Sequence, residues 1–311
     1  MPRYKIILNP TSGRGSGELA YPKIESLLVD LGVDFDLCRT NAPGHAIQLA
    51  EQAALAGYDV VVAAGGDGTA NEVLNGLGRA REQGADRAAM GLLTVGRGND
   101  FGFGIGAPPD LAAACQALAD NQRRWIDVGF VQGGDYPNGR YFGNGVGIGF
   151  DAVVCFEALK LKRLSGFPSY IVASLKTIFL YFKAPTVRIE FNGQELLQPS
   201  LMVSIMNGRR MGGGFMMAPE ARPDDGFFDL CIAAQVSKLG VFALIPRFMQ
   251  GTQAGHKAIR FARANQVVVT AVQGALPAHE DGETLCTAGE RLEIKLLPNF
   301  LQVVVPGEVP G

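Results

Sequence analysis

The residues best suited to chemistry form the segment Gly65-Gly66-Asp67-Gly68-Thr69, which follows a buried apolar run and precedes a helical pattern. Glycines let the backbone approach phosphate oxygens, and the start of a helix offers free N–H groups and a positive dipole end. Thr69 can cap that helix and donate a hydroxyl. An aspartate inside a phosphate cradle needs a cation to offset its charge, so Asp67 predicts Mg²⁺. The alternative is an ordinary glycine turn with a solvated aspartate.

Other polar segments end neighbouring predicted strands. The first strand ends at Asn9-Pro10, the fourth at Gly96-Arg97-Gly98-Asn99-Asp100, and the fifth carries Asp127. Parallel strands bring their carboxyl ends to one edge, so we expect Asp67, Asp100 and Asp127 to meet near a shared metal–phosphate site. Taken singly, each aspartate would be a helix cap or a turn residue. Neither GxxxxGK[ST] nor GxGxxG occurs, which argues against Walker ATPases and standard Rossmann dinucleotide enzymes.

These segments require a sheet with helices between its strands. Strand patterns at 4–9, 33–39, 58–64, 90–95 and 125–131 alternate with helical patterns, which is typical of βαβ units and a doubly wound parallel sheet. After about Phe130, short β patterns divided by Gly, Pro and Asn predict a mostly antiparallel β-sandwich. Asn192-Gly193 is its strongest hairpin signal. Two helical patterns interrupt this half, at 151–181 (broken near 166–168) and at 238–249.

Length and composition set the domain count and exclude some functions. The 311 residues exceed one core, so we expect an α/β nucleotide-binding domain at 1–130, to which a strand at 299–311 can return, and a β-rich domain at 131–298. A net charge of −2 argues against nucleic-acid binding over the whole surface. Five scattered cysteines and no apolar stretch long enough to span a bilayer favour a soluble, cytoplasmic protein.

Six segments together resemble the diacylglycerol kinase catalytic-domain family, which includes bacterial soluble lipid kinases and is related to sphingosine kinases. They are NPTSGRG (9–15), GGDGTANEVLNG (65–76), GRGNDFG (96–102), GNGVGIGFD (143–151), MAPEARPDDGFFDL (217–230) and EDGE (280–283). NAD kinases and phosphofructokinase relatives share GGDGT, and the other segments narrow the resemblance to lipid kinases. It implies an NAD-kinase-like nucleotide-binding domain and a lipid-substrate domain. The implied reaction is ATP- and Mg²⁺-dependent transfer of the γ-phosphoryl group to the hydroxyl of a diacylglycerol-like or other long-chain lipid.

The resemblance also implies roles for individual residues. The nucleotide and its Mg²⁺ would be held by Asn9, Thr40, Gly65, Gly66, Asp67, Gly68, Thr69, Gly96, Arg97, Asn99, Asp100 and Asp127. A second, structural Mg²⁺ would be bound by the side chain of Asp225 and the backbone carbonyls of Arg222 and Phe227. One acid of the DGE motif, Asp281 or Glu283, would be the general base, and spacing does not decide which. On its own, the segment 279–283 would be an exposed acidic turn.

The sequence departs from the family pattern at two places. Arg97 stands where relatives have a nucleotide-contacting Thr, and Gly102-Phe103-Gly104 follows Phe101 where many relatives have Ala-Arg. Lys160 or Lys162 would then have to supply a basic residue near the site. Two alternatives stay open: a kinase of a small soluble acceptor such as NAD, and a catalytically silent lipid- or nucleotide-binding module.

Two further patterns concern the second domain. Gly143, Gly145, Gly147 and Gly149 leave one face of a strand bare, so a helix or an acyl chain is expected to pack there. Residues 156–188 carry six basic residues and one acid among aromatic side chains. This predicts transient docking on an anionic leaflet at the inner membrane face, the alternative being a core-packed helix with a solvated basic face. We expect a homodimer if the chain forms any oligomer, and no nucleic-acid partner.

Overall fold

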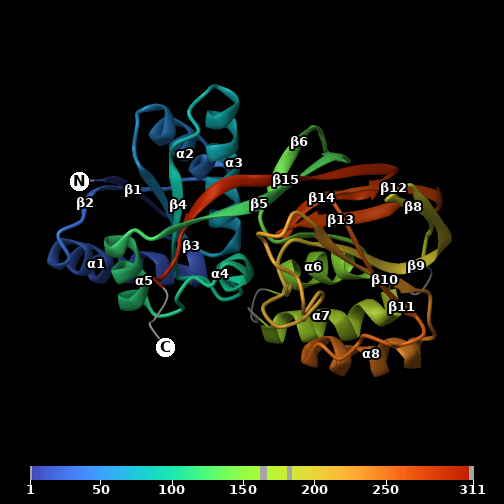
Figure 1. The fold of residues 1–311 in the computed structure, drawn as a ribbon. Helices are drawn as coiled ribbons and strands as arrows, with labels where there is room; N and C mark the ends of the chain where they lie inside the picture. Colours follow the sequence, from blue (N-terminus) through green and yellow to red (C-terminus); the bar gives the residue numbers. More distant parts are fainter. Residues whose placement is uncertain (1, 162–166, 181–183, 308–311) are drawn as a thin grey trace. The chain divides into compact units, whose positions relative to one another are not determined.

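The computed structural model describes residues 2–161, 167–180 and 184–307, and the chain divides into two compact units. The N-terminal unit comprises Met1–Ile126 and Asn299–Gly311, and the C-terminal unit comprises Asp127–Pro298. Figure 1 shows both as ribbons coloured along the sequence. Two strands, β5 (Arg123–Gly133) and β15 (Arg291–Val304), begin in one unit and end in the other.

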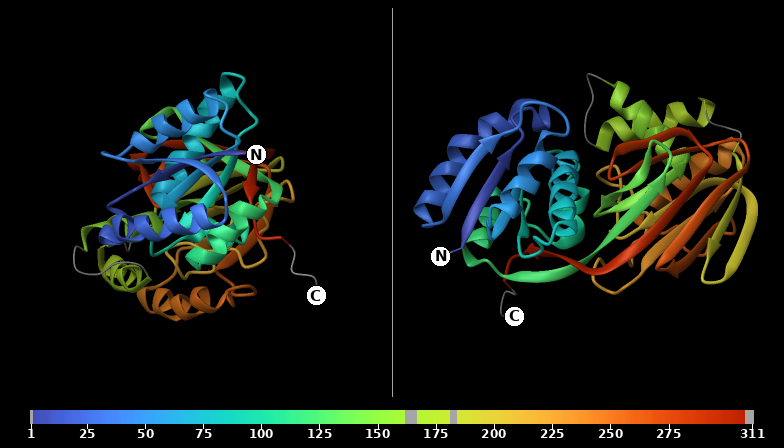
Figure 2. Two further views of the ribbon diagram at one scale, coloured as in Figure 1. Left: turned by 90° about the vertical axis from the view of Figure 1, so that its left-hand side faces the viewer. Right: turned by 90° about the horizontal axis from the view of Figure 1, so that it is seen from above.

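The N-terminal unit is built on a parallel sheet with the strand order β4-β3-β1-β2. Helices α2 and α3 pack together on one face of this sheet, and α1 and α5 pack together on the other (Figures 1 and 2). The strands are β1 (Arg3–Leu8), β2 (Asp34–Arg39), β3 (Val60–Gly65) and β4 (Ala89–Thr94). The helices are α1 (Ser12–Asp30), α2 (His45–Leu55), α3 (Asp67–Glu82), α4 (Asp100–Ile105) and α5 (Leu111–Asp120).

The C-terminal unit contains antiparallel strands whose longest member, β9, takes part in two sets of pairings. The first half of β9 pairs with β8, and its second half pairs with β7 and β10. The strands within this unit are β6 (Tyr136–Phe142), β7 (Gly145–Gly149), β8 (Thr186–Phe191), β9 (Gln194–Met206), β10 (Phe228–Ala234), β11 (Ile259–Ala264), β12 (Gln266–Gln273), β13 (Leu276–Glu280) and β14 (Glu283–Gly289). Helices α6 (Phe150–Lys160), α7 (Phe167–Leu180) and α8 (Lys238–Gln250) lie along one side of these strands (Figure 1).

Alternating side chains of β7 and β9 divide the C-terminal unit into two apolar clusters. Val146 and Val203 point into the cluster between the sheets, where Phe142 stacks on Phe228 with ring centroids 5.6 Å apart. Met202 and Met206 point the other way, toward the cluster that includes residues of α6, α7 and α8. One face of β9 therefore packs against strands and the other against helices, as a period of two requires.

The predicted fold class is confirmed: a parallel α/β unit and an antiparallel β unit are both present. Most predicted elements lie within two residues of the observed ones, including the hairpin at Asn192-Gly193, where both residues have positive φ. The helical pattern at 151–181, with its predicted break near 166–168, corresponds to two helices, α6 and α7. The fifth predicted strand, β5, does not pair with β4; β15 pairs with β4 in parallel, and β5 pairs with β15 and, antiparallel, with β6. Among the described helices, none combines the length and the hydropathy needed to cross a bilayer.

Candidate functional site

Two glycine-rich loops of the N-terminal unit cross with their backbones in contact. A methyl group on Gly96 would lie only 2.4 Å from the Cα of Gly66, and the amides of Val95 and Gly96 both donate to the carbonyl of Gly65. Gly66 is also the N-cap of α3, so the first turn of that helix starts at the crossing. The first N–H groups of a helix lack acceptors within it and favour anions. The crossing therefore presents backbone donors where a phosphate group can approach.

The carboxylates of Asp67 and Asp100 both lie close to the position where a side chain of residue 98 would begin. A methyl group on Gly98 would be 2.7 Å from Asp67 Oδ2 and 4.0 Å from Asp100 Oδ2. Asp67 begins α3 and Asp100 begins α4, and Asp67 Oδ1 accepts a hydrogen bond of 3.1 Å from the amide of Phe101. Two carboxylates are thus held at helix N-termini beside a residue without a side chain. Mg²⁺ is commonly bound by one or two carboxylates together with substrate phosphates, and this pair supplies those carboxylates.

The loop after β1 is tied to the same crossing through Asn9. Its Nδ2 donates to Thr69 Oγ1 over 3.0 Å, and its Oδ1 accepts from the amide and the hydroxyl of Thr11. Thr69 is buried as the third residue of α3, so the prediction that it caps this helix is wrong: Gly66 occupies the cap position. The hydroxyl of Thr69 instead accepts the hydrogen bond from Asn9, which joins the loop after β1 to the start of α3.

Two other predicted nucleotide-binding residues lie around these loops. The guanidinium of Arg97 is exposed and its Nη2 donates to the carbonyl of Gly13 over 3.4 Å, so it lies over the loop after β1. Thr40 directly follows β2, where its amide donates to the carbonyl of Leu8. The left-handed φ of Asn99 (53°) turns the chain into α4 and gives Asp100 its place.

In the C-terminal unit, the structure distinguishes the two acids of the DGE motif. The carboxylate of Asp281 is buried and accepts three backbone hydrogen bonds of 2.7–2.9 Å, from Gly143, Asn144 and Gly145. Its own amide donates to the carbonyl of Gly145, and its φ of 45° forms the turn between β13 and β14. Glu283, at the start of β14, is exposed. Asp281 therefore anchors the turn, and Glu283 presents the accessible carboxylate.

The segment 279–283 is mostly buried, so it is not the exposed acidic turn that these residues alone would suggest. His279 and Glu280 are buried on β13, and Glu280 Oε1 lies 2.5 Å from Arg140 Nε in an ion pair. Arg140 lies on β6, about half the chain away, so the residues around Glu280 in the sequence do not predict this ion pair.

Asp127 holds the loop that contains the DDG motif, Asp224-Asp225-Gly226. Its amide donates to the carbonyl of Pro223 over 2.6 Å, and its Oδ2 accepts from the amide of Gly226 over 2.7 Å. The sequence predicts that Asp127 lies on a fifth parallel strand, near Asp67 and Asp100. In the structure Asp127 lies on β5, which pairs with β15 and not with β4, and it belongs to the C-terminal unit. Its buried side chain closes the loop from 223 to 226.

The carboxylate of Asp225 already has a cationic partner. Arg263 Nη2 pairs with Asp225 Oδ2, Arg263 Nε lies 3.8 Å from Asp229 Oδ1, and the guanidinium lies 4.7 Å from the centroid of the Phe227 ring. Asp225 Oδ1 accepts from the amide of Phe227, and Arg222 pairs with Asp224. Within the described ranges, no group of three His, Cys, Asp or Glu residues is placed to hold a metal ion. As it stands, this donor set does not fit a structural Mg²⁺, because an arginine occupies its side-chain ligand.

The face of β7 that carries the glycines is covered by side chains. A methyl group on Gly147 would lie 2.4 Å from His279 Nε2 and 2.5 Å from Asp151 Oδ2, and one on Gly145 would meet the sulfur of Met206. Asp151, at the start of α6, also accepts a hydrogen bond of 2.8 Å from Ser204 Oγ. Glycine is required at 147 because an acid from α6 and an imidazole from β13 converge there. The glycine spacing predicts that a helix or an acyl chain packs on this face, and α6 does so through Asp151, but the spacing does not predict the polar cluster.

The basic segment at 156–188 is partly neutralised. Glu157 is buried between Lys160 and Lys176, whose ammonium groups lower the pKa of its carboxyl, and Arg188 pairs with Glu195. Lys162, Arg163 and Lys183 lie outside the described residues. The inner faces of α6 and α7 pack into the core, as the alternative interpretation expected. Phe179 is nevertheless 66% exposed.

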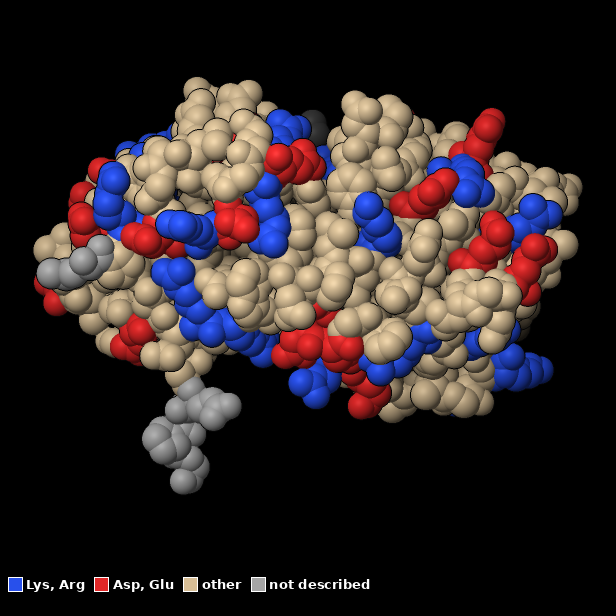
Figure 3. All heavy atoms as spheres, turned by 45° about the horizontal axis from the view of Figure 1, so that its top comes forward, with Lys and Arg blue, Asp and Glu red and all other residues tan. Residues whose placement is uncertain are grey.

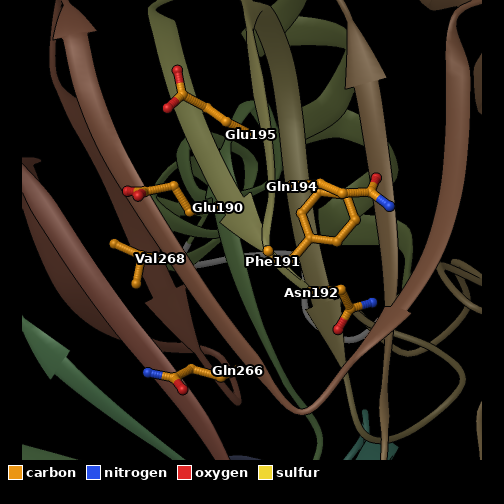
Figure 4. Close-up of a pocket in the computed structure, with 8 residues that line it drawn as sticks. Glu190, Phe191, Asn192, Gln194, Glu195, Gln266 and Val268 are labelled. Carbon is orange, nitrogen blue, oxygen red and sulfur yellow. The ribbon is translucent and has the colours of Figure 1, made fainter.

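Neither the surface charges nor the hollow at the β8–β9 hairpin identifies a further binding site. On the face drawn in Figure 3, Lys and Arg are interspersed with Asp and Glu. A hollow beside the β8–β9 hairpin is lined by residues of three adjacent strands, with Glu190 directly opposite Glu195 (Figure 4). None of the residues predicted to bind nucleotide, metal or acceptor lines it, and we assign it no role.

Comparison with known proteins identifies the class and then the family. A solved structure of an NAD kinase from Archaeoglobus fulgidus shares the fold, with a TM-score of 0.53 at 14% identity over 97% of this chain and 93% of that one. The family model of the diacylglycerol kinase catalytic domain matches residues 3–131. The model of the YegS C-terminal NAD kinase beta sandwich-like domain matches residues 144–305.

Curated relatives carry the identification further. Diacylglycerol kinase of Bacillus subtilis is 32% identical over 287 residues, which are 91% of this chain and 90% of the relative. Diacylglycerol kinase of Staphylococcus saprophyticus is 28% identical over 282 residues, 90% of this chain and 88% of the relative. A solved diacylglycerol kinase from Bacillus anthracis superposes with a TM-score of 0.74 at 21% identity, covering 98% of this chain and 96% of that one. The chain belongs to the diacylglycerol kinase family and is a lipid kinase, and the phosphoryl donor that a kinase implies is ATP.

Proposed function

We propose that this protein transfers the γ-phosphoryl group of ATP, with Mg²⁺, to the hydroxyl of a diacylglycerol-like lipid. The observation that carries the proposal is the pair of carboxylates, Asp67 and Asp100, held beside Gly98 where two glycine loops cross. The acceptor class comes from the curated relatives, which are diacylglycerol kinases matched over nine-tenths of the chain.

The nucleotide side of the reaction belongs to the N-terminal unit. The backbone N–H groups at the start of α3 would bind phosphate oxygens, and the exposed Arg97 would add a positive charge beside the loop after β1. Asp67 and Asp100 would hold Mg²⁺, which neutralises charge on the phosphates when it is bound. Phosphoryl transfer depends mainly on positioning and on charge neutralisation, and these residues supply both.

The acceptor side requires a group that orients the lipid hydroxyl and accepts its proton. We assign this role to Glu283, because its carboxylate is exposed while both oxygens of Asp281 are engaged by backbone N–H groups. Asp281 acts as a positioning residue that fixes the turn before Glu283. The mechanism does not depend on a metal ion at Asp225, since Arg263 already pairs with that carboxylate.

The acceptor is a membrane lipid, so the protein must reach a bilayer surface. We propose that the exposed apolar side chains of α7 and α8 touch an anionic membrane transiently. Phe179 (66% exposed) packs edge-on against Phe242, Lys238 lies 5.1 Å from the Phe179 centroid, and Leu239 is 81% exposed. An aromatic cluster with a cation beside it suits the headgroup region of an anionic leaflet.

A direct assay tests the proposed reaction. Purified protein is incubated with radiolabelled ATP and Mg²⁺, and with dioleoylglycerol in anionic mixed micelles or with NAD. Phosphatidic acid as the labelled product supports the proposal, and labelled NADP in its place would overturn it.

Membrane contact is tested by sedimentation with phosphatidylglycerol vesicles. Leu239→Ser should weaken binding, whereas the matched control Leu19→Ser, on α1 and 83% exposed, should not.

A further inference from the structure

Asn207 is a fully buried amide that joins two functional segments of the C-terminal unit. It directly follows β9, and its Nδ2 donates both of its hydrogens to backbone carbonyls, those of Asp127 and Gly143, each over 2.9 Å. Its own amide donates to the carbonyl of Asn144 over 2.8 Å. One side chain thus bridges β5 and the segment before β7.

Each of the two carbonyls belongs to a residue that holds a motif in place. On one side, the amides of Gly143, Asn144 and Gly145 bind the carboxylate of Asp281 and so fix the turn that leads to Glu283. On the other side, Asp127 closes the DDG loop through Pro223 and Gly226. A continuous series of hydrogen bonds therefore runs from Asp281 through 143, 207 and 127 to the loop at 223–226.

The choice of an amide at this position carries an energetic cost. Asn207 Oδ1 is buried and has no hydrogen-bond partner among the described residues. An unsatisfied buried acceptor lowers the stability of the folded state, and an apolar side chain at this position would avoid that loss. The amide does provide two donors in a rigid plane, and these reach the carbonyls of two separate segments, β5 and the residues before β7.

We propose that Asn207 is a positioning residue that fixes the Asp281–Glu283 turn relative to the DDG loop and so sets where the Glu283 carboxylate stands during phosphoryl transfer. The proposal rests on the proposed function, because that function gives Glu283 its role. Asn207 itself does not touch the reacting groups.

The chain supplies a matched control in Gln253. This amide is also fully buried, its Nε2 donates to the carbonyls of Met216 and Met217, and its Oε1 likewise has no partner among the described residues. Asn207→Asp and Gln253→Glu are both isosteric and both replace two N–H donors with an acceptor facing carbonyls. The two variants should therefore lower the melting temperature by similar amounts.

Kinetics and hydrogen exchange separate the two variants. At a temperature where both are folded, Asn207→Asp should lower kcat about 100-fold, since a displacement of about 1 Å can cost that much, with KM for ATP unchanged. Gln253→Glu should keep the wild-type kcat. Amide exchange should speed up at both Gly143–Gly145 and Gly226 in Asn207→Asp, and at neither place in Gln253→Glu. If Asn207→Asp does not fold, Asn207→Ser, which keeps one donor, should show an intermediate loss.

Two outcomes would overturn the inference. One is a wild-type kcat in Asn207→Asp or Asn207→Ser, and the other is exchange that speeds up at only one of the two segments. A wild-type protein that fails to phosphorylate diacylglycerol would defeat the proposed function instead. In that case the exchange measurement would still decide whether Asn207 couples the two segments.

Discussion

Gly98 and Asp67 are in such close contact that any side chain at position 98 would meet the Asp67 carboxylate. A methyl group at position 98 would lie 2.7 Å from Asp67 Oδ2, well inside van der Waals contact. The obstacle is the end of a side chain, so the fold can adapt by moving the carboxylate. The geometry of the two-carboxylate site therefore depends on a residue that contributes no atoms to it.

Gly98→Ala should lower kcat by about 100-fold while the melting temperature changes little, because the Asp67 carboxylate is displaced and the backbone is not. Gly17→Ala gives the contrasting case. Its methyl group would lie 2.0 Å from the carbonyl oxygen of Asn9, so it should destabilise the fold itself. Kinetics and thermal melts on both variants check this, and a fully active Gly98→Ala would contradict it.

Asp67→Ala should abolish measurable phosphoryl transfer, with a loss of at least about 10³-fold, because it removes a carboxylate proposed to hold Mg²⁺. The melt should fall only slightly, because the Asp67 side chain is half-buried and its hydrogen bond to the amide of Phe101 is replaced by water. Asp86→Ala, at an exposed acid elsewhere in the same unit, is the control. Full activity in Asp67→Ala would remove this residue from the mechanism.

The two acids of the DGE motif should respond differently to neutral isosteres. Glu283→Gln should lower kcat strongly and leave the melt unchanged, because its carboxylate is exposed. Asp281→Asn should lower both, since three N–H donors lose a charged acceptor, at a cost of about 2 kcal/mol or more. Urea unfolding and steady-state kinetics measure the two effects. A stable, inactive Asp281→Asn beside an active Glu283→Gln would reverse the assignment.

Asp151 and His279 should give opposing contributions to the pH dependence of stability. Burial raises the pKa of Asp151 from 3.8 to about 7 and lowers the pKa of His279 from 6.5 to about 4. The folded state thus favours protonated Asp151, whose contribution falls as pH rises from 3.8 to 7. It also favours neutral His279, whose contribution rises as pH rises from 4 to 6.5.

Replacing one of these two residues should therefore leave the contribution of the other to the pH dependence of stability unopposed. The unfolding free energy of Asp151→Asn should rise more steeply with pH than that of the wild type between pH 4 and 6.5, and that of His279→Gln should fall. Urea titrations at several pH values measure these slopes. Curves parallel to the wild type in both variants would show that neither group titrates as described.

Arg263→Ala should destabilise the C-terminal unit by about 1 kcal/mol, because the half-exposed guanidinium pairs with Asp225 and lies over Phe227. With Asp225 released, Mg²⁺ without nucleotide should raise the melt of this variant more than that of the wild type. Arg188→Ala, which removes an exposed pair with Glu195, is the matched control. If a chelator lowers the wild-type melt as far as Arg263→Ala does, a metal ion and not Arg263 holds the loop.

Local patterns predicted most of the elements and much of the nucleotide side. The buried run before Gly65, the glycines and the helical pattern after them are contiguous, so the strand, turn and helix could be predicted together. The proximity of Asp67 to Asp100 follows from the parallel order of β3 and β4. Both conclusions need only neighbouring strands of one sheet.

The remaining features depend on partners far apart in the sequence. Asp127 could not be placed, because β5 pairs with β15, a strand from the other end of the chain. The burial of Glu280 depends on Arg140, and the role of Asp281 depends on amides at 143–145. Asn207 gave no signal beyond a polar residue at the end of an apolar strand. Such contacts are set by sheet order, which alternation patterns do not determine.

Because β9 pairs with β8 through its first half and with β7 and β10 through its second half, an insertion in the β8–β9 hairpin should affect both sets of pairings. The tight turn at Asn192-Gly193 fixes the register of β9 against β8, and the same strand continues to β7, β10 and finally Asn207. A residue added to this hairpin would invert the side chains of the whole strand with respect to its neighbours. A surface loop remote from the chemistry is therefore as unforgiving of length changes as the residues around the reacting groups.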